Sequence, residues 1–242
     1  IDKYKELLKK YSPEKIIMLS HTNVAADELK DAILKLPEMI ERGLRKKFFK
    51  YKICTIHAFC KSKLLKKELI TYADYLNLCA ENSGFKAQRV TQSEFDNDKH
   101  KFFKFLSDSF GQGRTIREHW NSLRETSSNY YPYNNFRMIY EMKEVYDNYK
   151  KVNQVCDYND MIKDFIDHAV VPDIDVLIVD EAQDSNVPQI KALEKMSTNV
   201  KEYYMVGDAD QTIFEFAGAN ADYFHKLSKD AEQLEDGLRC GE

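Results

Sequence analysis

A run of four apolar residues, Val176–Val179, leads directly into two carboxylates, Asp180 and Glu181. The run does not alternate with polar residues, so it predicts a strand buried on both faces of a parallel sheet. Two adjacent charges at the end of such a strand cost free energy unless a cation lies nearby. In open parallel sheets the carboxyl ends of the strands bind ligands. The pair suits Mg²⁺ binding and water activation in nucleotide hydrolysis, although two solvated acids at a strand end would explain it equally well.

The composition is that of a globular chain outside a membrane. The 242 residues are 43% hydrophobic and 31% charged, and no apolar run is long enough to span a bilayer. The N-terminus does not read as a signal peptide. Five cysteines without a CxxC pair argue against disulfides and zinc, so a reducing, cytoplasmic setting is expected. Because the sequence opens on Ile1 inside an apparent helix, we expect a piece of a longer protein.

Strand and helix patterns alternate in both halves of the chain. Short apolar runs predict strands, and runs with helical spacing of apolar residues lie between them. The alternation indicates an α/β fold with a parallel sheet flanked by helices. The expected strands are Lys15–Leu19, Lys52–Ile56, Val176–Val179 and Tyr203–Val206, and the expected helices are Tyr4–Tyr11, Val24–Leu36 and one that opens at His57.

The middle of the chain has a different character. It shows helical spacing of apolar residues, polar links, and no strand of comparable quality. We interpret it as an α-helical insertion subdomain between two halves of the sheet. The predicted helices are Leu64–Leu78, Asp98–Phe110 and Asn135–Tyr149. The predicted division is 1–63 for the first half of the sheet domain, 64–154 for the insertion, 155–233 for the second half, and 234–242 for a segment leading onward.

Polar residues follow the first predicted strand. His21, Thr22 and Asn23 lie between that strand and a helix, and Thr22 or Asn23 is a credible N-cap. Exposed amides at a helix N-terminus suit a phosphate of a nucleotide or a nucleic acid. Taken alone, the stretch is better explained as an ordinary capped helix.

A basic stretch rich in aromatic residues runs from Arg45 to Lys67. It holds nine lysines and arginines, no acid, and interleaved rings. A cationic groove with stacking rings is typical of single-strand binding, where each stacked base is worth about 1–3 kcal/mol. The alternative is a solvated lysine face over core aromatics, and Phe59 is expected in the core.

The last dense cluster of polar residues follows the Tyr203–Val206 strand. In the stretch Val206–Ala219, Gln211 is placed to reach a terminal phosphate or its attacking water. Phe214 and Phe216, two residues apart, can both offer rings to bases. An ordinary turn explains this density of glycine, acids and glutamine poorly.

Six segments, in family order and at family-like spacing, resemble superfamily 1 helicases of the UvrD/Rep/PcrA type. Val179–Asp184 resembles motif II, and Val206–Phe214 with Gly218 and Ala219 resembles motif III. Single segments are weak signals, but together they bracket nearly the whole chain. The remaining four are Thr22–Ala26 (motif Ia), Thr55–Cys60 (the next DNA-contacting motif), Asp157–Met161 (the return to the motor domain) and Leu234–Arg239 (the start of motif IV).

The resemblance implies a RecA-like (P-loop NTPase) sheet and a role for each matching residue. Asp180 would bind Mg²⁺ on ATP, and Glu181 would activate the water beside the same metal. Gln211 would sense the γ-phosphate and Arg239 would supply positive charge to the transition state. The residues implied to line the single-stranded DNA path are His21, Thr22, Asn23, Thr55, His57, Phe214 and Phe216.

The sequence departs from the family pattern in ways that bear on activity. The phosphate loop, GxxxxGK followed by Ser or Thr, does not occur among the eight glycines, and its place would be just before Ile1. The second motor domain is also missing, because the sequence stops at Glu242. Motif IV has Leu238 in place of its tyrosine, and Ala217 stands in place of an arginine of motif III. We therefore expect this chain alone to be inactive.

The sequence thus predicts the first motor domain of an ATP-dependent DNA helicase. The resemblance implies stepping along single-stranded DNA, 3′ to 5′, in repair, replication or recombination, with ATP and Mg²⁺ as cofactors. Expected partners are single-stranded DNA, single/double-strand junctions, the second motor domain, and a nuclease or repair protein, in a bacterial or phage-encoded system and away from membranes. Two alternatives stay open: the motor subunit of a helicase–nuclease or phage-defence system, and a non-catalytic DNA-binding relic without the phosphate loop.

Overall fold

The centre of the molecule is a parallel sheet. The structure, a computed structural model, describes residues 1–63, 67–97, 99–126 and 135–208. Its four-stranded sheet has the order β2-β1-β5-β6, and all three pairings are parallel. The strands are β1 (Ile16–Ser20), β2 (Ile53–Thr55), β5 (Val176–Val179) and β6 (Glu202–Met205). The prediction of a parallel α/β sheet is confirmed, and each strand lies within two residues of its expected bounds.

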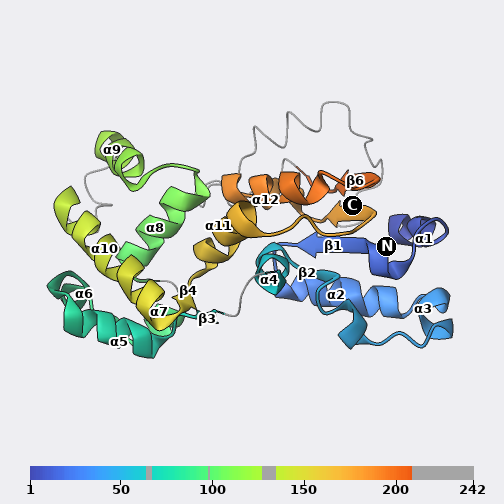
Figure 1. Ribbon diagram of the computed structural model, residues 1–242, viewed down its shortest axis with the longest axis horizontal. Helices are drawn as coiled ribbons and strands as arrows, with labels where there is room; N and C mark the ends of the chain where they lie inside the picture. The colour runs from blue at the N-terminus through green and yellow to red at the C-terminus, as the bar shows by residue number, and fades with distance from the viewer. Residues whose placement is uncertain (64–66, 98, 127–134, 209–242) are drawn as a thin grey trace, which may run out of the picture.

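The strand order places a topological switch between β1 and β5. From β1 the chain crosses to β2 on one side, and from β5 it crosses to β6 on the other (Figure 1). The register pairs Ile16 with Val176 and Leu19 with Val179, so the two strands end side by side. In sheets of this kind the crevice at the carboxyl ends beside the switch binds ligands. Asp180 and Glu181 follow β5 at this edge.

Both faces of the sheet are covered, as the uninterrupted apolar run requires. Each residue of β5 is at most 3% exposed. Leu177 and Val179 belong to one hydrophobic cluster and Val176 and Ile178 to another, because successive side chains alternate across the sheet. Burying side chains of this size contributes about 1.5–3 kcal/mol each.

Helices flank the sheet on either side. The first cluster includes residues of α4 (Ile56–Ser62), α11 (Tyr158–His168) and α12 (Val187–Ser197). The second includes residues of α1 (Asp2–Leu8), α2 (Asn23–Leu34) and α3 (Pro37–Glu41). Three 3₁₀ helices complete this part of the chain: η1 (Pro13–Lys15), η2 (Lys46–Phe49) and η3 (Ala182–Asp184).

The chain between α4 and α11 forms a helical insertion with a hydrophobic core of its own. Figure 1 shows its helices gathered beyond one end of the sheet. Aromatic side chains dominate this core, among them Tyr75, Phe102 and Tyr146. The helices are α5 (Tyr72–Glu81), α6 (Ser83–Ala87), α7 (Gln92–Asp96), α8 (Lys101–Gly111), α9 (Ile116–Thr126) and α10 (Phe136–Asn153).

Two very short strands join the insertion to the rest. β3 (Glu68–Leu69) leads into it and β4 (Val155–Cys156) leads out, and the two pair in parallel. The Ile70 amide extends the pairing by donating to the Cys156 carbonyl over 3.0 Å. The expectation of one helix over Leu64–Leu78 is therefore wrong at its start, since the helix begins only at Tyr72.

A charged cluster lies under this joint. The Lys150 ammonium of α10 contacts the Asp157 and Asp160 carboxylates at 2.8 Å each, with its side chain only 11% exposed. The Tyr146 hydroxyl donates to Asp157 over 2.9 Å. Burial lowers the pKa of Lys150, but the two carboxylates more than reverse this and raise it above its ordinary value. The cluster ties the last helix of the insertion to the N-terminus of α11.

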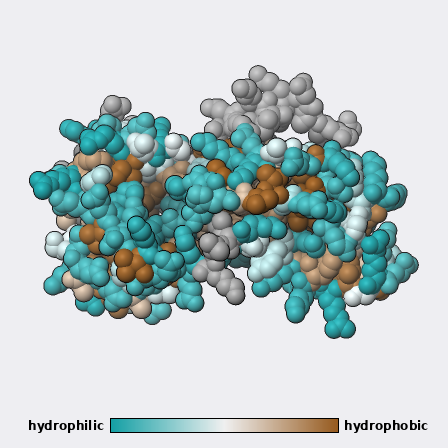
Figure 2. All heavy atoms as spheres, viewed as in Figure 1, coloured by the Kyte–Doolittle hydropathy of each residue, from teal (hydrophilic) through white to brown (hydrophobic). Residues whose placement is uncertain are grey.

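The surface of the molecule is largely polar. In Figure 2 hydrophilic residues cover most of the visible face over both the sheet and the insertion, with hydrophobic residues in small separate groups. Among the helices in the described parts of the chain, not one combines the length and the apolar character needed to cross a membrane.

Candidate functional site

The two carboxylates lie where the sequence predicted them, at the carboxyl end of β5. The Asp180 amide still donates to the Leu19 carbonyl over 2.8 Å, so the ladder with β1 continues to this point. Glu181 then adopts a left-handed backbone, with φ of 53°. This conformation costs a residue with a side chain roughly 1 kcal/mol or more, and strained residues of this kind cluster at functional sites. The turn sends the chain into η3 and leaves the Glu181 carboxylate beside the strand end.

Gln183 holds Glu181 in place. Its side-chain amide donates to the Glu181 carboxylate over 2.8 Å, and its side-chain oxygen accepts from the Asp208 amide over 3.2 Å. The residue is only 2% exposed. A second bond, from the Ala182 amide to the Val206 carbonyl at 2.9 Å, fixes the same loop to the chain after β6. The segments resembling motifs II and III are thus joined through a buried glutamine.

The loop carries excess negative charge. Burial, and then the charge of Glu181, raise the pKa of the Asp184 carboxyl. One carboxylate oxygen of Asp184 is buried and has no hydrogen-bond partner within the described part of the chain. Such an oxygen costs free energy unless a cation or a donor reaches it. The local chemistry favours a cation beside this loop.

Threonines cap the two helices that follow the neighbouring strands. The Thr22 hydroxyl accepts from the Ala25 amide over 3.1 Å at the start of α2, which confirms Thr22 as the N-cap. The Thr55 hydroxyl accepts from the Ala58 amide over 3.2 Å at the start of α4. Each cap is worth about 1 kcal/mol. The ordinary capping explanation therefore holds for both residues, but each hydroxyl keeps a proton to donate.

Two histidines occupy the same edge of the sheet. The His21 ring lies 3.0 Å from the Ser185 hydroxyl, which links the end of β1 to the loop after Glu181. The His57 ring meets the Tyr158 ring edge-on, with centroids 5.6 Å apart. Burial lowers the pKa of His21 to about 4, with a further contribution from His57, and burial lowers the pKa of His57 to about 4. Both rings are neutral at pH 7, so they can bind by hydrogen bonds and ring contacts but not by charge.

The structure divides the sequence-predicted site residues into two groups. His21, Thr22, Asn23, Thr55, His57, Asp180 and Glu181 all lie at the carboxyl edge of the sheet. Gln211, Phe214, Phe216 and Arg239 lie outside the described residues, as do Ala217 and Leu238.

In its described residues, 45–63 and 67, the basic stretch from Arg45 to Lys67 is divided between the two ends of the sheet. η2 precedes β2 and α4 follows it, so the two ends of the stretch lie at opposite edges of the sheet. Lys46 is 3.1 Å from Asp31, and Phe49 and Phe59 are core residues with at most 1% exposure. Phe59 was expected in the core, and this is confirmed. The first half of the stretch is closer to a solvated lysine face over core aromatics, and only its later lysines lie near the carboxyl edge.

Sequence reasoning missed three residues of this edge. Gln183 and Ser185 stand within or next to the segment resembling motif II, but their distant partners, Asp208 and His21, follow other strands. Tyr158 stands in the segment resembling the return to the motor domain, and its contact with His57 crosses the insertion. The signal available for all three was a polar or aromatic residue inside a recognised segment or directly after it.

A comparison with protein-family models agrees with this geometry. The model for the UvrD/REP helicase N-terminal domain matches residues 2–232. The chain belongs to this family. The UvrD/REP helicase N-terminal domain is RecA-like, and the sheet with its flanking helices is that fold.

Curated relatives of this UvrD/REP helicase domain are similar along almost its whole length. ATP-dependent DNA helicase Rep of Buchnera aphidicola subsp. Baizongia pistaciae is 26% identical over an alignment of 238 residues that covers 93% of this chain and 33% of that protein. The probable DNA helicase II homologue of Mycoplasma pneumoniae is 26% identical over 92% of the chain and 32% of its own length. The homologue of Mycoplasma genitalium is 28% identical over 87% and 31%. The chain spans about a third of these relatives.

Proposed function

We propose that this UvrD/REP helicase domain is the first motor domain of an ATP-dependent DNA helicase that moves 3′ to 5′ along single-stranded DNA. The observation that carries the proposal is the Asp180–Glu181 pair at the carboxyl end of β5, beside the switch between β1 and β5, with Glu181 held by the buried Gln183. An oriented carboxylate at a ligand-binding edge is what water activation requires.

The residues present suit Mg²⁺ in the company of a nucleotide. No group of three or more metal-ligating side chains is found within the described ranges. Mg²⁺ prefers oxygen ligands and is commonly held by one or two carboxylates together with phosphates and water. Asp180 is proposed to hold it, with Glu181 nearby, and the unpartnered oxygen of Asp184 supports a cation at this loop. Bound there, the ion would neutralise charge on the phosphates of ATP.

Glu181 is the proposed base for the attacking water. Its backbone is left-handed at the end of β5, and the Gln183 amide fixes its carboxylate. Gln211 is proposed to sense the γ-phosphate, and Arg239 to supply positive charge to the transition state. These two roles rest on the family resemblance.

The DNA strand is proposed to cross the same edge of the sheet. His21, Thr22, Asn23, Thr55 and His57 would contact it, with Phe214 and Phe216 stacking on bases. The threonine hydroxyls can donate to phosphates, and the neutral rings of the two histidines can make ring contacts. His21 reaches Ser185 of the hydrolytic loop, which supports a direct link between DNA contact and hydrolysis.

The wider setting is proposed from the relatives. Their names describe DNA helicases of bacteria, which supports a bacterial DNA helicase. A cytoplasmic role in DNA repair, replication or recombination is proposed with it. Single/double-strand junctions, a second motor domain, and a nuclease or repair partner belong to the same proposal.

The test compares DNA-stimulated ATP hydrolysis by the full-length protein with that of single variants. Glu181→Gln should lower kcat about 10²–10⁴-fold, the usual contribution of general base catalysis. Single-strand binding should be kept. Glu194→Gln, an exposed change on α12, is the control and should behave as the unaltered protein. Unchanged kcat in Glu181→Gln would remove the proposed hydrolytic role.

The 242-residue chain by itself is proposed to be inactive, because it holds no phosphate loop to cradle ATP. A strand-displacement assay on a fluorescent partial duplex tests this directly. Unwinding by the chain, purified free of other helicases, would contradict the proposal.

A further inference from the structure

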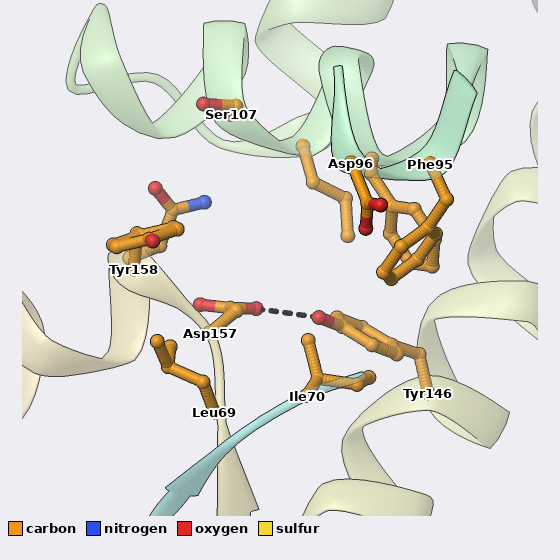
Figure 3. A pocket seen from close by; sticks show the side chains of 11 residues that line it. Leu69, Ile70, Phe95, Asp96, Ser107, Tyr146, Asp157 and Tyr158 are labelled. Carbon is orange, nitrogen blue, oxygen red and sulfur yellow. Dashed lines mark hydrogen bonds between the residues drawn. The ribbon is translucent and has the colours of Figure 1, made fainter. Parts of the chain in front are cut away.

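Besides the joint of β3 with β4, the helical insertion contacts the sheet domain at the C-terminal end of α8. Figure 1 shows this end of α8 beside the start of α12. At the joint, the Tyr146 hydroxyl donates to Asp157 (Figure 3). Between the two contacts lies a cavity of about 330 Å³, lined by Ser107 of α8 and Tyr158 of α11 among others (Figure 3). The cavity interrupts the packing between the insertion and α11, so the orientation of the insertion depends on the contact at the end of α8.

The end of α8 is built as a firm support. Phe110 belongs to the insertion by its place in the sequence, but it packs against the hydrophobic cluster formed by the sheet, α4, α11 and α12. The turn that follows, residues 112–115, is braced by its own hydrogen bonds. The Gly113 amide donates to the Phe110 carbonyl over 2.8 Å, and the Ser109 hydroxyl donates to the Arg114 carbonyl over 2.9 Å.

Gly113 of this turn lies directly against Val187, the first residue of α12. Its backbone is left-handed, with φ of 65°. A Cβ atom added to Gly113 would lie 2.8 Å from Cγ1 and 3.3 Å from Cβ of Val187, and real Cβ atoms essentially never come within 3.0 Å of another heavy atom. A valine in a helix keeps one strongly preferred rotamer, so the methyl group cannot simply turn away. A side chain at residue 113 would therefore push the start of α12.

The start of α12 is tied closely to the hydrolytic loop, residues 181–185. Val187 comes two residues after this loop. The Asn186 side chain accepts from the Gln189 amide over 3.1 Å, and the Gln189 side chain accepts from the Asn186 amide over 2.9 Å, so a capping box fixes where the helix begins. Ser185, between the loop and the cap, is only 1% exposed. A shift of Val187 is therefore passed on to the carboxylates of the loop.

We propose that Gly113 is a positioning residue for ATP hydrolysis: the turn after α8 contacts Val187 and holds the start of α12, and with it the hydrolytic loop, in place. The inference rests on the proposed function, since it needs hydrolysis at Glu181. It gives the insertion a part in the chemistry through a contact with the sheet domain. Because coupling between two sites acts in both directions, a ligand bound at the loop would also bias the orientation of the insertion.

The experiment measures kcat and KM of DNA-stimulated ATP hydrolysis by the full-length protein. Gly113→Ala should lower kcat about tenfold and leave KM within about twofold, because a small misplacement of a catalytic group slows chemistry more than binding. Gly43→Ala is the matched control and should keep both values. Gly43 also has a left-handed backbone, with φ of 61°, but a Cβ atom there would meet nothing within 4 Å.

A size exchange separates the contact from a general loss of structure. Val187→Ala removes the two methyl groups that an added side chain would meet. In the Val187→Ala background, Gly113→Ala should therefore change kcat less than about twofold. An unchanged kcat in Gly113→Ala, or a fall that Val187→Ala does not relieve, would overturn the positioning role while Glu181→Gln still lowers kcat. If Glu181→Gln leaves kcat unchanged, the proposed hydrolytic role falls and the role of Gly113 falls with it.

Discussion

The Gln183 side chain makes two hydrogen bonds at the carboxyl edge of the sheet, one to the Glu181 carboxylate and one from the Asp208 amide. The side chain is buried, so water cannot replace either bond in a variant. Leaving a buried donor or acceptor unpaired costs about 1–3 kcal/mol. Gln183 is therefore a positioning residue in the proposed site, acting through Glu181.

Gln183→Leu tests this role. We expect kcat for DNA-stimulated ATP hydrolysis by the full-length protein to fall about 10- to 100-fold with little change in KM, because misplacing a catalytic group slows chemistry more than binding. Gln183→Glu should also be impaired, since it sets two carboxylates together. Gln92→Leu, an exposed change on α7, is the control. A normal kcat in a folded Gln183→Leu protein would contradict the role.

For single residues, the sequence predicts where in a strand or helix a residue lies better than it predicts which residues its side chain contacts. Asp180 and Glu181 were expected at a strand end because an apolar run stops there. The partnership of Gln183 with Asp208 depends on the pairing of β5 with β6, which brings distant segments together. No local sequence pattern encodes how close these two segments come, so only the fold reveals the hydrogen bond between Gln183 and Asp208.

Among the elements, the strands were predicted closely and the insertion less so. Buried parallel strands carry a strong signal, because they need four or five apolar residues in a row. β3 and β4 are two residues each and partly exposed, so they have no such signal. The helix α9 was missed although Ile116, Trp120 and Leu123 have helical spacing, because its other residues are polar.

The element that most depends on one side chain is the joint of α10 with α11. Lys150→Met would leave the Asp157 and Asp160 carboxylates facing each other without their cation. Removing one partner of a buried ion pair costs about 3–5 kcal/mol, so we expect a loss of that size in urea unfolding. Lys163→Met, which breaks the exposed pair with Asp167 on α11, is the control and should cost less than about 1 kcal/mol. Equal effects of the two variants would contradict a special role for Lys150.

For the whole molecule, buried histidines make stability depend on pH on the acid side. Burial lowers the pKa of His21, His57 and His100 to about 4, and also lowers that of His119. The folded state then binds fewer protons than the unfolded state between pH 6.5 and 4. Stability is therefore complete above the unfolded pKa and falls as the pH drops through this window.

His100 should account for a large share of this dependence. It is 1% exposed, and neither ring nitrogen has a hydrogen-bond partner among the residues that the structure describes. A pKa lowered from 6.5 to about 4 corresponds to about 3 kcal/mol. His100→Phe should flatten the curve of unfolding free energy against pH between 7 and 4.5, whereas the exposed His168→Gln should not. An unchanged slope in His100→Phe would show that other groups control the acid transition.

The pairing of β3 with β4 allows the insertion to change in length during evolution. Neighbouring strands lie about 4.8 Å apart, so the segments that enter and leave the insertion start and finish at nearly one point. The distance that the insertion must span is therefore the same, however many residues it contains. The cost of closing a longer loop rises only with the logarithm of its length. At the β3–β4 pair, helices of the insertion can be lengthened, exchanged or lost while the four strands that position the carboxylates keep their register.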